Sequence, residues 1–295
     1  MTERPDALLG ALLGLAVVVL AAAGSMLAVL TDCTVGGLAM RVLASLSACV
    51  VFFHDVRSVP FGGLVLAVLV LASLAAVVRE LGRAHAAHRL LRQLPLDSLD
   101  PDLGRGLGRR ESVRVFVVPA SRPFAFCAGL LRPRVVVSAS LLERLDEQER
   151  TAALWHEIAH ARRREPLKTL LARAAAGALF WLPAVRDLLE RYLLAKELAA
   201  DGLALRKTSA QALAGALCGV LETPSPAGAV GLADLAGARI ERLLDPTASL
   251  PPLFCRRRLA ATIATLAALG FAVSVPIGVG IGRIDALHAA LGALF

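Results

Sequence analysis

The segment of residues 153–162 constrains the fold of this chain most strongly. It reads ALWHEIAHAR and places His156, Glu157 and His160 within five residues. Residues four apart lie on the same face of a helix, one turn from each other. If this segment is helical, both imidazoles can reach one metal ion while the Glu157 carboxylate lies beside it. The segment therefore predicts a helix that carries part of a metal site.

The spacing H-E-x-x-H is typical of zinc metallopeptidases. In such sites two neutral imidazoles and a third protein ligand hold zinc with one position open for water. The glutamate takes the proton as that water attacks a peptide carbonyl. A chance occurrence in a solvated helix is the alternative. The uncharged neighbours from Ala152 to Trp155, together with Ile158 and Ala159, argue against it, because buried histidine and glutamate without partners are costly.

A third ligand is expected from residues 187–207, which read DLLERYLLAKELAADGLALRK. Glu197 and Asp201 are four residues apart and share a helix face. Apolar residues surround Glu197, where an unpaired carboxylate would be costly, so we predict that it binds the metal. Asp201 then fits a supporting acceptor that orients one imidazole. An exposed face on which Glu197 pairs with Lys196 or an arginine is the alternative.

Long apolar runs indicate membrane spans. Apolar residues make up 57% of the 295 residues, and the mean hydropathy is +0.66, which exceeds that of ordinary soluble domains. Four spans are expected, at about residues 7–30, 35–53, 59–78 and 259–282. A cleaved signal peptide is the alternative for the first run, but its length and the later runs favour a span.

Arginines gather at both ends of residues 79–258. One cluster follows the third run, between residues 79 and 92, and Arg256 to Arg258 precede the fourth. The positive-inside rule therefore predicts a cytoplasmic domain at 79–258, with both termini and a short tail at 283–295 outside the cell membrane. The net charge of +8 is explained by this topology. No nucleic-acid partner is expected, because the basic residues form no stripe with interleaved aromatic residues.

The cysteines indicate neither a disulfide framework nor a cysteine metal site. They are odd in number, scattered and without a C-x-x-C pair, at Cys33, Cys49, Cys127, Cys218 and Cys255.

Several local elements are expected around the motif. Residues 113–118, 124–128 and 134–138 read as three short strands of a small sheet. The sequence favours two roles for this sheet equally: an edge strand that holds an extended substrate, or a hairpin with a structural role only. Asp146 and Glu149 predict a capping box that starts the metal helix at about residue 147. Residues 170–185 are apolar but short, and predict one interfacial or re-entrant helix limited by Pro183.

Four stretches carry a resemblance to a known family. They are HEIAHARRREP, KELAAD, GARIERLLDP and FAFCAGLLRPRVVVSASLLERLDEQE. Together they resemble the integral-membrane metallopeptidases of the BlaR/MecR beta-lactam-sensor type, whose two metal elements are shared with the HtpX and CAAX prenyl protease type. The resemblance implies that His156, His160 and Glu197 bind one zinc ion per chain. It also implies that Glu157 is the catalytic acid/base and that Asp201 supports the site.

The expected fold is a mainly α, multi-pass membrane protein. A helical HExxH zincin domain of gluzincin-like type, with a small β-sheet, is expected between the transmembrane helices. BlaR/MecR sensors continue beyond the fourth span into a large extracellular penicillin-binding domain, whereas this chain ends at Phe295. Recognition of beta-lactams is therefore not expected, and cleavage of a cytoplasmic repressor is one candidate role.

The expected function is a membrane-embedded zinc endopeptidase that cuts a protein or peptide substrate at the cytoplasmic face of the bilayer. An HtpX-like quality-control protease is one alternative. A non-catalytic zinc scaffold would not need Glu157, and a small-molecule transporter would want ionisable groups inside spans, where only Arg41 qualifies. The chain has no asparagine, so an arginine or Tyr192 is left to stabilise an oxyanion.

Overall fold

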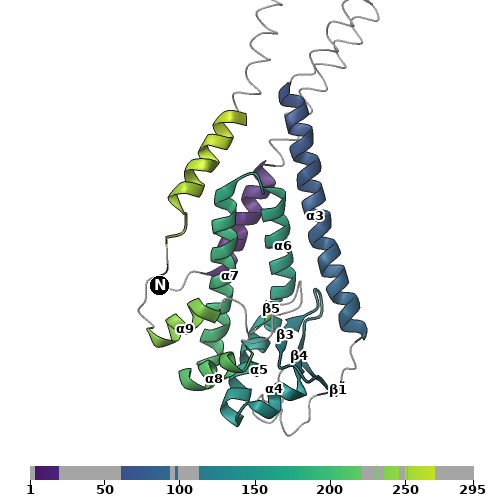
Figure 1. Ribbon diagram of the computed structural model, residues 1–295, viewed down its shortest axis with the longest axis vertical. Helices are drawn as coiled ribbons and strands as arrows, with labels where there is room; N and C mark the ends of the chain where they lie inside the picture. The colour runs from purple at the N-terminus through teal and green to yellow at the C-terminus, as the bar shows by residue number, and fades with distance from the viewer. Residues whose placement is uncertain are drawn as a thin grey trace, which may run out of the picture.

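The computed structural model describes residues 4–19, 61–93, 97–98, 113–220, 230–231, 236–245, 250 and 252–269. A small sheet lies at one end of the molecule together with α4, α5 and α8 (Figure 1). Helices α6 and α7 extend away from this end, and α3 runs alongside α6. A mostly helical chain with a small sheet was expected from the sequence, and this part of the expectation agrees with the structure.

The helices alternate with short strands along the chain. The helices are α3 (Phe61–Gln93), α4 (Ala139–Arg144), α5 (Glu147–Arg162), α6 (Glu165–Ala178), α7 (Pro183–Ala204), α8 (Ala210–Val220) and α9 (Ala236–Leu244). Residues 5–19 and 256–269 are also helical. The strands are β1 (Asp97–Ser98), β2 (Arg114–Val118), β3 (Ala125–Ala128), β4 (Arg134–Ser138) and β5 (Val230–Gly231).

The sheet has the strand order β1-β2-β4-β3-β5. Strands β2 and β4 are parallel, whereas β3 pairs antiparallel with β4 on one side and with β5 on the other. The turn after β3 needs Gly129, which has a φ of 103° and whose added Cβ would lie 2.7 Å from the Arg132 carbonyl oxygen. The three predicted strands are confirmed to within one residue at each end.

Helix α5 begins with the predicted capping box. The Glu149 backbone N–H donates to Asp146 Oδ1 at 2.8 Å, and the Asp146 N–H donates to Glu149 Oε2 at 3.0 Å. The helix therefore starts at Glu147, as expected. It ends at Arg162, and the chain reverses through Arg164, a non-glycine residue with a φ of 54°, into α6.

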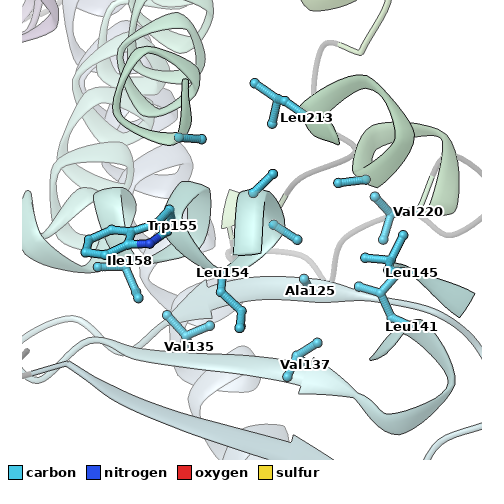
Figure 2. Close-up of a cluster of buried hydrophobic side chains, with 14 of the residues drawn as sticks. Ala125, Val135, Val137, Leu141, Leu145, Leu154, Trp155, Ile158, Leu213 and Val220 are labelled. Carbon is cyan, nitrogen blue, oxygen red and sulfur yellow. The ribbon is translucent and has the colours of Figure 1, made fainter. Parts of the chain in front are cut away.

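A core of apolar side chains fixes the position of α5. Figure 2 shows Leu154 and Ile158 of α5 above Val135 of β4, with Leu213 of α8 on the opposite side of the helix. Ala152 to Ala161 are all buried. Burial of each leucine-sized side chain contributes about 1.5 to 3 kcal/mol. The metal-motif helix is therefore held between the sheet and α8, as a rigid support for its polar residues.

A second core joins the long helices. Leu9, Leu12 and Ala16 of the helix of residues 5–19 are buried against Leu179 and Tyr192. Helix α3 packs on α6 as well, and there the Ser73 hydroxyl donates to the carbonyl oxygen of Ala178 at 2.6 Å.

The single helix predicted over residues 170–185 is wrong. Residues 170–178 complete α6, and Pro183 begins α7 instead of ending a helix. Proline is well tolerated at the first helical position, because the N–H group that it lacks has no partner within the helix there.

The prediction of a multi-pass membrane fold is contradicted. Among the described residues, no helix combines the length and the apolar character that a membrane crossing requires. The first predicted span, 7–30, is described only to residue 19, and its apolar side chains at positions 9, 12 and 16 pack against protein. Hydropathy cannot distinguish apolar residues that face lipid from apolar residues that face another helix.

The remaining predicted boundaries are only partly covered. The span at 35–53 and the tail at 283–295 lie outside the described residues, and the spans at 59–78 and 259–282 are described in part. Helix α3 continues through residue 79 without a break, so the expected domain boundary falls within a continuous helix. The division into domains stays a prediction.

Candidate active site and metal centre

Two helices bring the candidate ligands together. His156 and His160 come from α5, and Glu197 comes from α7, which packs against it. Each residue offers one ligand atom, and these atoms all lie within 4.8 Å of one another. All three residues are fully buried. The two helix segments that the sequence selected thus meet at one point inside the protein.

Hydrogen bonds fix which nitrogen of each imidazole carries the proton. His156 Nδ1 lies 2.8 Å from Asp201 Oδ1, and His160 Nδ1 lies 2.5 Å from Glu165 Oε2. An ionised carboxylate only accepts hydrogen bonds, so each imidazole donates from Nδ1. In the neutral form that binds a metal, both Nε2 atoms are therefore left as acceptors.

The two free imidazole nitrogens face each other. His156 Nε2 and His160 Nε2 are 2.9 Å apart, and Glu197 Oε2 lies 3.4 Å from the first and 3.6 Å from the second. When both imidazoles are neutral, three acceptors converge here without a donor, and they repel one another unless a cation lies between them. Two imidazole nitrogens and a carboxylate oxygen are also a common ligand set for a transition metal. The residues present therefore fit a metal ion.

The environment of Glu197 supports the same conclusion. Neither carboxylate oxygen has a hydrogen-bond partner within the described part of the chain, although Lys196 Nζ lies 3.3 Å from Oε1. Burial acts to raise the pKa of Glu197, but the charges of His160 and Lys196 hold it well below its usual range. A buried ionised carboxylate needs positive charge around it, which Lys196 supplies in part and a bound cation would complete. The alternative of an exposed helix face is excluded, since both Glu197 and Lys196 are buried.

The electrostatics of the cluster favour a positive charge at this point. Burial acts to lower the pKa of His160, but Glu197 and Glu165 outweigh it and raise that pKa to about 10. The buried groups comprise four carboxylates and two cations, Glu157, Glu165, Glu197, Asp201, Lys196 and Arg239. With neutral imidazoles and every other group ionised, their formal charges sum to −2, which a divalent cation neutralises.

Glu157 has the properties of a proton acceptor at neutral pH. Its side chain is fully buried beside the two histidines, and neither oxygen has a hydrogen-bond partner among the described residues. Burial raises the pKa of Glu157 to about 7, against the opposing effect of His160 and His156. General acid–base catalysis is most effective when the pKa lies near the working pH.

Glu165 was not identified from the sequence. It is the first residue of α6, it is 2% exposed, and it orients His160 as Asp201 orients His156. Carboxylates that hold ligating histidines through the second ring nitrogen are common in metal sites. The sequence places a carboxylate only five residues after His160, which could have suggested a hydrogen-bond partner for that imidazole. The arginines before Glu165 were instead interpreted as the end of a helix.

Arg239 of α9 was also missed, although its stretch was quoted for the family resemblance. Its guanidinium is fully buried and binds Asp201 through two nitrogens, with Nε donating to Oδ2 at 2.8 Å and Nη2 donating to Oδ1. Nη1 lies 3.5 Å from Glu197 Oε2. Burial acts to raise the pKa of Asp201, but its hydrogen bonds from His156 and Arg239 keep that pKa below its usual range.

The two candidates for an oxyanion-stabilising group lie in different places. Tyr192 is buried in the apolar cluster with Leu12 and Leu179, where burial raises its pKa. Arg239 lies at the ligands themselves. Only the arginine therefore contacts a candidate ligand through an interaction that the structure records.

Two known proteins are similar to part of the chain. Over 71 residues it is 41% identical to a protein named Protease HtpX homolog from Desulforapulum autotrophicum, which covers 23% of each chain. Over 81 residues it is 35% identical to a Protease HtpX homolog from Aquifex aeolicus, covering 26% of this chain and 27% of that protein. The chain thus spans about a quarter of the length of these relatives. The similarity over these segments supports a protease.

A family model covers a larger share. The model described as BlaR1 peptidase M56 matches residues 61–233, more than half of the chain. The matched segment contains the HEIAH helix and the Glu197 helix, but it ends before Arg239. The chain therefore belongs to the BlaR1 peptidase M56 family.

Proposed function

We propose that this chain is a zinc-dependent endopeptidase that hydrolyses a peptide bond of a protein substrate. His156, His160 and Glu197 are the proposed ligands of one zinc ion per chain. The observation that carries the proposal is the convergence, at a buried point, of two Nε2 atoms and one carboxylate whose oxygens have no hydrogen-bond partner among the described residues. Catalytic zinc sites use three protein ligands of these types and keep a fourth position open.

The residues around the ligands have separate duties in this proposal. When bound, zinc supplies Lewis-acid polarisation of the substrate carbonyl and lowers the pKa of water. Glu157 accepts a proton from the attacking water and returns it to the departing amine nitrogen, which its pKa of about 7 allows. Asp201 and Glu165 hold the imidazoles in place, and Arg239 holds Asp201.

A catalyst explains Glu157 better than a metal-binding scaffold does. A scaffold needs the ligands and their supporting carboxylates, but it has no use for a fourth buried carboxyl group without a hydrogen bond. Such a group costs free energy of folding. Groups that are costly for stability yet sit beside a reactive centre are typical of active sites.

The exposed apolar side chains favour a lipid surface as a second partner. Helix α3 and the helix of residues 256–269 carry large apolar side chains that are more than half exposed, namely Val68, Leu71, Leu74, Val78, Leu81 and Ile263. Apolar surface of this extent marks an interaction site. We propose that these helices contact a lipid bilayer and that the substrate is a polypeptide reached from its surface. A cytoplasmic repressor, suggested by the family resemblance, is the first candidate.

The decisive experiment compares Glu157→Gln with Glu197→Ala in the purified full-length chain. Glu157→Gln should retain about one zinc per chain and lose at least about 100-fold in peptide hydrolysis, because only the proton acceptor is removed. Glu197→Ala should lose both activity and most of the zinc. Zinc is measured by plasma mass spectrometry and hydrolysis with an unfolded protein substrate.

Glu147→Gln is the matched control, since Glu147 is exposed on the same helix. It should retain both zinc and activity. Full activity in Glu157→Gln would refute the proposed mechanism. Full zinc content in Glu197→Ala would refute Glu197 as the third ligand.

A further inference from the structure

A separate cavity of about 580 Å³ lies between α3, α6, α7 and the first turn of the helix of residues 256–269. Each of these four helices contributes one arginine to its wall, Arg83, Arg173, Arg186 and Arg258, and α3 adds Glu80. A smaller cavity of about 220 Å³ shares Glu80, Arg83 and Arg173. The cavity is therefore lined by more positive than negative groups.

The remaining wall of the larger cavity is apolar. Leu179, Phe180, Leu182 and Leu189 line it beside the arginines. Phe180 is 53% exposed, so the apolar wall continues to the outer surface. A volume of several hundred cubic ångströms with an apolar wall and a few charged groups is typical of a site for a small amphiphilic molecule.

Most charges in the wall are already paired. Arg83 contacts Glu80, Arg186 Nε lies 2.9 Å from Glu190 Oε1, and Arg258 Nη1 lies 3.1 Å from Glu190 Oε2. Arg258 also lies 2.5 Å from Asp187 Oδ1. Each carboxylate at the cavity thus has an arginine partner.

Arg173 differs from the other three arginines. Within the described ranges, no ion pair or hydrogen bond of its side chain is recorded, although it lines both cavities. The cavity also lies at the amino-terminal end of α7, where the helix dipole adds positive potential. An anion bound in this cavity would form an ion pair with Arg173.

The cavity is distinct from the metal centre. Arg186 precedes Glu197 by eleven residues on α7, which corresponds to roughly 16 Å along the helix. None of the wall residues is a candidate metal ligand. A ligand in this cavity would therefore act independently of the proposed peptidase chemistry.

We propose that this cavity binds a phosphate group carried on an apolar tail, as in the headgroup of an anionic phospholipid. Guanidinium groups bind phosphate through paired N–H donors, and Arg173 has these donors available. The apolar wall, which opens to the surface at Phe180, accommodates the first carbons of the tail. The inference goes beyond the proposed function and does not depend on the zinc site.

Isothermal titration calorimetry on the purified full-length chain tests the proposal. The probe is dihexanoyl phosphatidic acid below its micellar concentration, because a monomeric lipid avoids general adsorption to exposed apolar helices. It should bind with a stoichiometry of one, and at least tenfold more tightly than dihexanoyl phosphatidylcholine. Inorganic phosphate, which lacks a tail, should bind at least tenfold more weakly.

Variants identify the residue responsible. Arg173→Gln should weaken phosphatidic acid binding about tenfold, Arg173→Lys should retain more of it, and Arg206→Gln should leave it unchanged, since Arg206 is exposed at the far end of α7. Thermal unfolding checks that Arg173→Gln is folded. Equal binding of phosphatidylcholine, or an unchanged affinity in folded Arg173→Gln, would overturn the proposal. If inorganic phosphate binds as tightly as phosphatidic acid, the ligand of the cavity is a soluble phosphate compound and the proposal of a lipid is wrong.

Discussion

Cys127 shows how the buried charges of the site affect a neighbouring residue. It lies on β3, where it is fully buried. Burial raises the pKa of its thiol well above the usual value, and the charges of Glu157 and Glu165 raise it further. The thiol is therefore held in its neutral form. Cys218 and Cys255, in contrast, are exposed.

The raised pKa of Cys127 predicts a loss of stability at alkaline pH. An unfolded thiol ionises near pH 8.5, so this contribution to stability is present below about pH 8.5 and is lost as the pH rises toward the folded value. The free energy of unfolding should fall by about 1.4 kcal/mol per pH unit in that window. Urea unfolding between pH 7 and 10 should show a slope that is steeper by this amount in the wild type and in Cys218→Ala than in Cys127→Ala. An unchanged slope in Cys127→Ala would contradict the assignment.

At the scale of elements, α8 is packed directly against the first turn of α5. An ideal Cβ at Gly215 of α8 would lie 1.9 Å from Glu149 Oε1, the carboxylate that completes the capping box. The absence of a side chain at Gly215 therefore allows both the helix contact and the cap. The start of the metal-motif helix thus depends on a residue that lies far from it in the sequence.

Gly215→Ala should displace the Glu149 carboxylate from its hydrogen bond with the Asp146 N–H. It should therefore be about 1 kcal/mol less favourable than Gly202→Ala, which has the same gain in helix propensity without the loss of a cap. In a Glu149→Ala background Gly215→Ala should have a smaller effect, because the cap is already lost. Thermal and urea unfolding of the two single variants and the double variant measure this coupling. Gly202→Ala on α7 is the control, since no atom lies within 4 Å of its added Cβ. Additive effects of Gly215→Ala and Glu149→Ala would disprove the coupling.

At the scale of the whole molecule, the structure separates two kinds of apolar surface. The helix of residues 5–19 turns Leu9, Leu12 and Ala16 inward against α6 and α7. Helix α3 leaves Leu71 and Leu74 exposed on its outer side. The inward set stabilises the fold, whereas the outward set is available for the proposed lipid contact.

The double substitution Leu71→Asp, Leu74→Asp should weaken binding to phosphatidylcholine vesicles at least about tenfold, because two charges would enter the lipid contact. Flotation of the purified chain with vesicles measures this binding. Leu131→Asp is the matched control, since Leu131 is 77% exposed in the turn between β3 and β4. Equal flotation of the double variant and the wild type would exclude α3 as the lipid-contacting helix.

The sequence by itself determined the elements that local interactions govern. The capping box set the start of α5, and short runs of β-branched and aromatic residues set β2 and β4. The four-residue spacings on α5 and α7 also selected the side chains that meet in the candidate site, because that spacing places residues on one helix face. These features depend on neighbours only a few residues apart.

Only the tertiary structure decided the rest. The direction in which the apolar residues of the first run face, and the separation of α6 from α7, depend on contacts between distant segments. So do the tautomers of the two imidazoles, which Asp201 and Glu165 fix, and the pairing of Arg239 with Asp201 across 38 positions of the chain. Hydropathy and motif spacing do not indicate which distant side chain will supply a charge or an apolar contact. These partners are determined only when the fold brings distant segments together and buries them.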